Sequence, residues 1–128
     1  MSYYFARTLN ADFASAVART RQALQQEGFG VITEIDVRQT MLAKLGVEFR
    51  PYLILGACNP GMALEALALE DKVGTMLPCN VVVQQLAPDR IEVAAVDPVA
   101  SMRAIDNPKL LETAAIVGSK LQAAIRAI

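Results

Sequence analysis

The sequence predicts an α+β domain in which five short strands form one antiparallel or mixed sheet and the long helices pack on one face. Two observations lead to this fold class. Five segments have strand-like patterns. Between them, helix starts are marked by an Asn or Asp that precedes Pro or a polar first turn. In addition, Ala87-Pro88-Asp89 reads as a hairpin turn between the last two strands, which makes at least part of the sheet antiparallel.

The chain opens with an aromatic-rich strand over residues 2–8, from Ser2 to Thr8. Asn10 is then expected to cap a helix that carries Asp12 in its first turn and stops near Gly28. A helical face of Phe13, Val17, Thr20 and Leu24 supports this helix.

A second strand is expected over residues 29–37, where apolar and polar residues alternate. Asp36 can cap a short helix that Gly46 closes. The third strand, Tyr52 to Ala57, is apolar on both faces, which is typical of a central strand covered on both sides.

Asn59-Pro60 predicts a helix to about Glu70, because Asn caps and Pro fits the first helical position. Strands are expected over residues 80–86 and 90–96, and a helical turn over residues 98–103. Asn107-Pro108 then opens a C-terminal helix, whose apolar stripe consists of Leu110, Ala114, Val117, Leu121, Ala124 and Ile128.

The composition indicates one domain over residues 1–128, since the chain has 128 residues and no Pro/Gly/Ser-rich linker. Hydrophobic residues make up 54% of the chain, which is high for a single domain in water. A second copy could cover the excess apolar surface, so a homodimer is expected.

Charge and residue usage exclude several classes of function. Twelve basic and thirteen acidic residues give a net charge of −1, which argues against a nucleic-acid partner. Without histidine, Ser-His-Asp and Cys-His catalysis are excluded, and the two cysteines have no zinc-site spacing. We therefore expect no cofactor and no metal.

The amino-terminal residues lack the basic and apolar regions of a secretory signal. The longest apolar stretches are far shorter than the roughly 18 residues of a membrane span. The expected location is cytoplasmic, without a membrane partner, and there thiols stay reduced.

One candidate site is the corner between the third strand and the following helix. Gly56 and Gly61 are spaced as in a P-loop, but Met62 and Ala63 replace the lysine and the hydroxyl residue that a P-loop needs. The remaining prediction is a small anionic or polar ligand at the helix amino terminus, where Gly56, Asn59 and Gly61 converge. The candidate ligand-binding residues are Gly56, Cys58, Asn59, Gly61, Cys79 and Asn80. The alternative is a tight turn with an ordinary cap.

The cysteines form the second feature of this corner. If the third and fourth strands are antiparallel neighbours, Cys58 at the end of one approaches Cys79 at the start of the other, with Asn80 beside it. Cys58 is expected to be the more reactive thiol, because a helix amino terminus favours the thiolate. The alternative is that both are buried packing residues.

The segments Leu55-Gly56-Ala57-Cys58-Asn59-Pro60 and Leu77-Pro78-Cys79-Asn80-Val81-Val82-Val83, with Gly28-Phe29-Gly30-Val31, resemble the family called domain of unknown function 302. The resemblance implies a small bacterial or archaeal domain with a curved, largely antiparallel five-stranded sheet in β-α-β(4)-α order, related to the TATA-binding-protein-like fold. The second and third helices then count as insertions. It implies neither DNA binding nor any activity.

Three functional hypotheses follow. The leading one is a small-ligand or protein-binding module that acts as a homodimer. The second is thiol redox or sensing chemistry, with Cys58 and Cys79 as the candidate catalytic residues. The third is a structural partner domain. A deep polar pocket at the Cys58 corner would favour a ligand, and a flat, dry corner would favour a structural role.

Overall fold

The computed structural model describes residues 2–128. Its centre is one antiparallel sheet with the strand order β1-β5-β4-β3-β2. Every pair of neighbouring strands is antiparallel, so the predicted fold class is confirmed. The strands are β1 (Tyr4–Leu9), β2 (Gly30–Asp36), β3 (Tyr52–Cys58), β4 (Cys79–Ala87) and β5 (Arg90–Val96).

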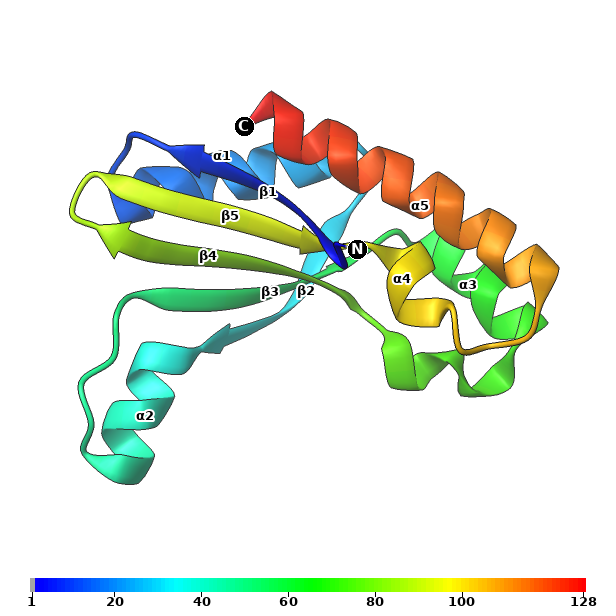
Figure 1. Ribbon diagram of the computed structural model, residues 1–128, viewed down its shortest axis with the longest axis horizontal. Helices are drawn as coiled ribbons and strands as arrows, with labels where there is room; N and C mark the ends of the chain where they lie inside the picture. The colour runs from blue at the N-terminus through cyan, green and yellow to red at the C-terminus, as the bar shows by residue number, and fades with distance from the viewer. Residues whose placement is uncertain (1) are drawn as a thin grey trace.

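Five α-helices and one 3-10 helix join these strands or follow them within the described residues (Figure 1). The helices after the second and third strands, α2 and α3, are the insertions expected in the β-α-β(4)-α order. The helices are α1 (Phe13–Gln26), α2 (Val37–Leu45), α3 (Pro60–Leu69), the 3-10 helix η1 (Asp71–Met76), α4 (Pro98–Met102) and α5 (Pro108–Ala127).

The main core lies between one face of the sheet and the helices α1 and α5. Alternate strand residues point into it, among them Leu55, Val81 and Val93, each fully buried. Leu24 of α1 and Leu121 of α5 close this core from the helix side. A second, smaller cluster joins α3, η1, α4 and the start of α5 beyond the end of the sheet.

Local capping signals set most helix ends. The side chains of Asn59 and Asn107 accept hydrogen bonds from the third residues after them, and Gly46 closes α2 with a left-handed φ of 63°. The predicted cap at Asn10 is wrong. Asp12 caps α1 instead, because its carboxylate accepts both the Ser15 N–H and the Ser15 hydroxyl, at 2.8 and 2.9 Å.

The opposite face of the sheet carries no helix layer, and α2 projects away from the body of the domain (Figure 1). Helix α2 has no buried residue, and its Leu42 and Leu45 are 55% and 69% exposed. Among the helices formed by residues 2–128, none is long and apolar enough to cross a membrane.

Candidate functional site

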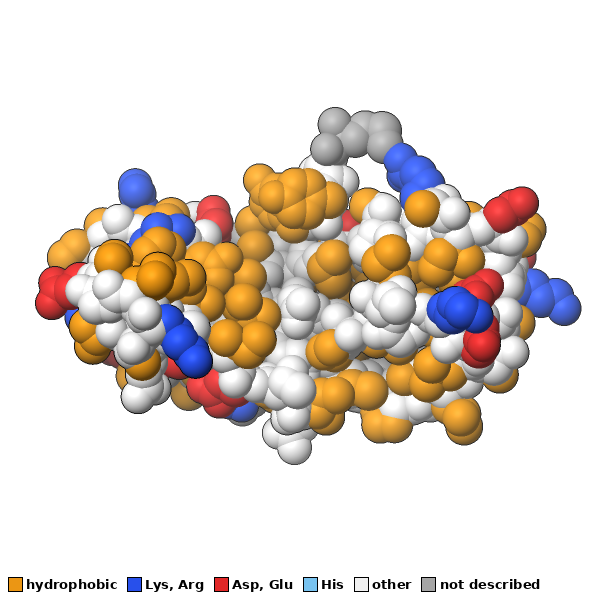
Figure 2. Space-filling view, turned by 90° about the horizontal axis from the view of Figure 1, so that it is seen from below, with side chains coloured by type: hydrophobic (Ala, Val, Ile, Leu, Met, Phe, Trp, Pro, Cys, Tyr) orange, Lys and Arg blue, Asp and Glu red, His pale blue; other side chains and the backbone are white. Residues whose placement is uncertain are grey.

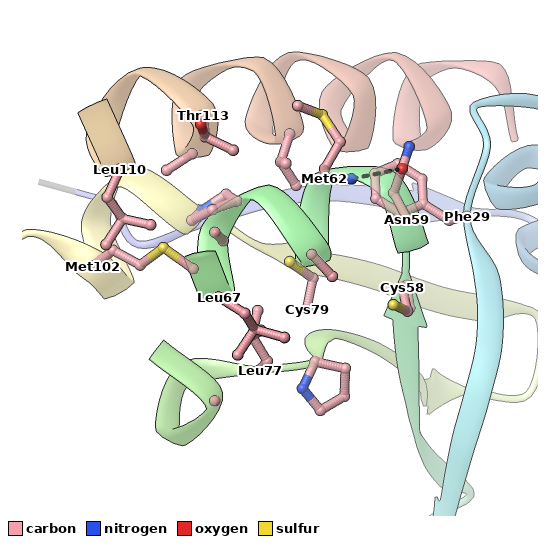
Figure 3. A pocket seen from close by; sticks show the side chains of 18 of the residues that line it. Phe29, Cys58, Asn59, Met62, Leu67, Leu77, Cys79, Met102, Leu110 and Thr113 are labelled. Carbon is pink, nitrogen blue, oxygen red and sulfur yellow. Dashed lines mark hydrogen bonds between the residues drawn. The ribbon is translucent and has the colours of Figure 1, made fainter. Parts of the chain in front are cut away.

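The candidate site is a pocket of about 360 Å³ at the end of the sheet where β3 and β4 meet the smaller helical cluster. Helix α3 forms one wall and α5 another, while η1, α4 and the ends of the strands complete it (Figure 3). This volume lies within the usual range for small-molecule sites. The pocket contains the corner that the sequence singles out.

Antiparallel pairing of β3 and β4 brings the two cysteines to this pocket. Ala57 lies directly opposite Cys79, so Cys58 lies one residue beyond the partner of Cys79. The two strand ends are therefore neighbours, as predicted, and both thiols line the pocket. Both cysteines are free.

The two thiols have different surroundings. Cys79 is buried, and burial, followed by the nearby Cys58, raises the pKa of Cys79 to about 11. Cys58 lines the pocket and is partly exposed. Cys79 therefore stays a neutral thiol at physiological pH, and Cys58 is the thiol that solvent reaches.

Asn59 lines the same end of the pocket, but its side chain already has a structural role. Its Oδ1 accepts the Met62 N–H at 3.3 Å, which caps α3 (Figure 3). Its Nδ2 lies close to Gly28, where an added Cβ would come within 3.2 Å. Asn59 thus connects the start of α3 to the turn that follows α1.

The other three predicted site residues are not in the pocket wall. Gly56 is buried between its neighbours, because a Cβ there would clash with Thr33 Oγ1 and lie 2.7 Å from Pro78 Cγ. Gly61 is exposed in the first turn of α3. Asn80 is exposed on β4, next to the inward-facing Cys79. These three residues and Asn59 do not converge on one polar point.

The pocket wall consists mainly of residues that sequence reasoning left out or assigned to packing. They come from the turn after α1, from α3, from the segment before β4 and from α4 and α5; the principal ones are Phe29, Met62, Leu67, Leu77, Met102 and Leu110. Their apolar character was visible in the sequence, but apolar residues fill cores far more often than they line pockets. Only the packing of α3 against α5 shows that a space remains.

The pocket offers few polar groups. No charged side chain lines it, and Thr113 directs its hydroxyl to Glu65 Oε1 at 3.1 Å and to the Lys109 carbonyl at 3.3 Å. Across residues 2–128, no three His, Cys, Asp or Glu side chains cluster in a way that could hold a metal ion. The arrangement can therefore enclose an apolar molecule beside a partly exposed thiol.

Comparison with known proteins gives consistent results. The family described as "Domain of unknown function DUF302" matches residues 5–128. The crystal structure of an uncharacterized conserved DUF302 protein from Bacillus stearothermophilus has the same fold, with a TM-score of 0.91 and 28% sequence identity over 99% of this chain and 98% of that chain. No curated protein matches the chain. Because the family match spans almost the whole chain and agrees with the observed topology, the chain belongs to the DUF302 family.

Proposed function

We propose that this protein is a small-ligand-binding module that acts as a homodimer, and that its ligand is a mainly apolar molecule held in the pocket between α3 and α5. The observation that carries this proposal is the partly open pocket of about 360 Å³ at the Cys58 corner, which is apolar and not the polar pocket that the sequence analysis associates with a ligand. An apolar pocket with a few polar groups at its rim is the usual form of a small-molecule site.

The polar groups of the wall favour an apolar over an anionic ligand. The Oδ1 of Asn59 is bonded to the Met62 N–H, and the Thr113 hydroxyl is bonded to Glu65. A charged ligand would lose its hydration in this pocket without gaining a charged partner, and this loss costs several kcal/mol. An apolar ligand loses only unfavourable contact with water.

A pair of fluorescent probes tests the proposal. N-phenyl-1-naphthylamine is neutral and apolar, and 1-anilinonaphthalene-8-sulfonate has the same ring system with a sulfonate. We expect the neutral probe to bind the native protein with a stoichiometry of one per chain. Ala63→Phe should weaken its binding by about tenfold or more, because Ala63 lines the pocket and a phenyl group would occupy it.

Ala68→Phe is the matched control, since Ala68 is exposed on the same helix and does not line the pocket. Equal binding by both variants would contradict the proposal. The anion site that the sequence suggested would instead be supported by two results together. The sulfonated probe would bind more tightly than the neutral probe, and Asn59→Ala would abolish its binding. Native mass spectrometry of freshly purified protein would report any ligand retained from the cell.

Thiol sensing is the second candidate function, because Cys58 and Cys79 both line the pocket and lie at neighbouring strand ends. Here a two-electron oxidant such as a diazenedicarboxamide would take both thiol hydrogens and leave a Cys58–Cys79 disulfide. Intact-mass analysis should then show the loss of two hydrogens, and Cys58→Ser should prevent it. Unchanged mass after oxidation of the native protein would count against this function.

A further inference from the structure

The uncovered face of the sheet carries a continuous apolar row that crosses all five strands. The strand register places the members of this row side by side, in the order Ala6, Ala94, Val82, Ile54 and Ile35. The neighbours of these residues point to the helix side: Arg7 donates to the Arg126 carbonyl of α5, and Glu34 pairs with Arg21 of α1. The row therefore lies on the face that no helix covers.

We propose that this face is the interface between the two copies of the chain, with α2 of each copy completing it; the assignment rests on the homodimer proposed above. On this face, the two rows of side chains on either side of the apolar row are mostly uncharged. Glu92 is the only charged residue of the described strands that belongs to them, and it accepts a hydrogen bond from Gln84 at 3.1 Å. Arg90 at the start of β5 shares this face, and Arg50 donates to Gln84 at 2.9 Å. Two arginines beside Glu92 do not make the basic surface that nucleic acid needs.

The sizes of the side chains in the row favour a second copy as the occupant. They increase from alanine at the β1 edge, through Val82 on the middle strand β4, to isoleucine at the β2 edge. A two-fold axis parallel to β4 in the plane of the interface would place the β5 strand of one copy over the β3 strand of the other. Ala94 would then face Ile54 of the second copy, and small side chains would meet large ones.

The area of the face explains why α2 belongs to the interface. Five strands about 4.8 Å apart and three rows about 7 Å apart cover roughly 500 Å². A standard interface needs about 800 Å² from each partner, so the sheet alone is too small. Helix α2 adds the exposed Leu42 and Leu45, and Figure 2 shows it at one end of the molecule beside a gathering of apolar side chains.

Helix α2 packs only weakly on its own chain, where it contacts β2 and β3. It has nine residues and no buried side chain, whereas an isolated helix shorter than about 12 residues is marginal in water. In the chain it connects the end of β2 to the segment before β3. A second copy supplies the missing contact, which neither water nor the rest of this chain provides.

The oligomeric state tests the interface. We expect sedimentation equilibrium to show a dimer at about 100 µM, and Ile35→Lys to raise the dimer Kd by about 30-fold or more, as for a buried interface residue. Ile116→Lys on α5 is the matched control, since Ile35 and Ile116 are 50% and 51% exposed. The control should change Kd by less than about threefold. Leu45→Lys should weaken the dimer like Ile35→Lys.

Exchanging the side-chain sizes at positions 94 and 54 tests the two-fold axis. Ala94→Ile overfills one half of the row and Ile54→Ala empties the other, so each should raise Kd by about tenfold. The double variant should return to within about threefold of the native protein, because the new side chains would face each other across the interface. Additive loss in the double variant would overturn this arrangement.

A monomeric native protein at about 100 µM would overturn both the homodimer and its interface. A native dimer that survives Ile35→Lys and Leu45→Lys in folded variants would overturn the interface alone. Thermal unfolding followed by circular dichroism shows whether each variant is folded. Probe binding in the pocket is measured separately, so a failure of the ligand proposal remains distinguishable.

Discussion

Thr33 Oγ1 on β2 occupies the space in which a side chain at Gly56 on β3 would lie. The two residues are cross-strand partners, and Pro78 closes the same space from the segment before β4. Gly56 therefore allows three segments to approach closely at the end of the sheet where the pocket begins. The structure therefore requires a glycine here for packing, and the ligand-binding role that the sequence suggests for Gly56 stays a prediction.

Gly56→Ala should lower the free energy of unfolding by about 1–3 kcal/mol, because the added methyl group forces a shift at Thr33 and Pro78. Gly61→Ala is the matched control. A Cβ at Gly61 meets only Asn59 Oδ1 at 3.8 Å, so this variant should stay within about 0.5 kcal/mol of the native protein. Urea titrations measure both values, and equal stability of the two variants would contradict the close approach at Gly56.

The two thiols should differ in reactivity. Cys58 is partly exposed and Cys79 is buried, so a maleimide should label Cys58 of the native protein at pH 7 at least about tenfold faster. Peptide mapping after timed quenching measures the two rates. Denatured protein is the control, in which the rates should converge. Equal labelling of both cysteines in the folded protein would show that Cys58 is no more accessible to solvent than Cys79.

The sequence predicted the sheet well because its signals are local. Alternating residues and the Ala87-Pro88-Asp89 turn marked the strands, and Asn59-Pro60 and Asn107-Pro108 marked two helix starts. The start of α1 was misplaced because Asn10 and Asp12 are both good caps two residues apart. The choice depends on Ser15, which gives Asp12 two hydrogen bonds.

The candidate site was only partly predictable. The meeting of Cys58 and Cys79 followed from the return of the chain between two antiparallel strands. The pocket itself depends on how α3, α4 and α5 pack, and residues such as Met102 and Leu110 look like ordinary core positions in the sequence. Gly56 and Gly61 looked equivalent in sequence, yet only Gly56 is required by its neighbours.

The raised pKa of Cys79 predicts a loss of stability in alkaline solution. The thiol holds its proton in the folded protein up to a pKa of about 11, whereas its ordinary value is 9.0. Between these values the unfolded chain releases the proton more readily than the folded one, so stability falls as pH rises through this window. The difference corresponds to about 2–3 kcal/mol.

Cys79→Ala should remove this part of the pH dependence, and Cys58→Ala is the control that should retain most of it. Comparing the urea midpoints of the three proteins at pH 8 and pH 10.5 cancels the contributions of tyrosines and lysines, which all three share. If the stability of the native protein falls no more between pH 8 and pH 10.5 than that of Cys79→Ala, burial does not perturb this thiol.

Asn107 should contribute more to stability than an ordinary helix cap. Its Oδ1 accepts the Leu110 N–H at 3.2 Å, which caps α5, and its Nδ2 donates to the Leu69 carbonyl at 3.0 Å, which satisfies the end of α3. One side chain therefore fixes the two helices that form opposite walls of the pocket. Of these two types of contact, Asn59 makes only the capping bond, which it accepts from the Met62 N–H.

Asn107→Ala removes both contacts and should cost about 2–3 kcal/mol, against about 1 kcal/mol for Asn59→Ala. Asn107→Asp separates the two, because a carboxylate still accepts the Leu110 N–H but repels the Leu69 carbonyl oxygen. In urea denaturation, the free energy of unfolding of Asn107→Asp should be at least as close to that of Asn107→Ala as to that of the native protein. Asn107→Asp with native stability would show that the bond to Leu69 contributes nothing, and that apolar packing and the Thr113–Glu65 hydrogen bond hold α3 and α5 together.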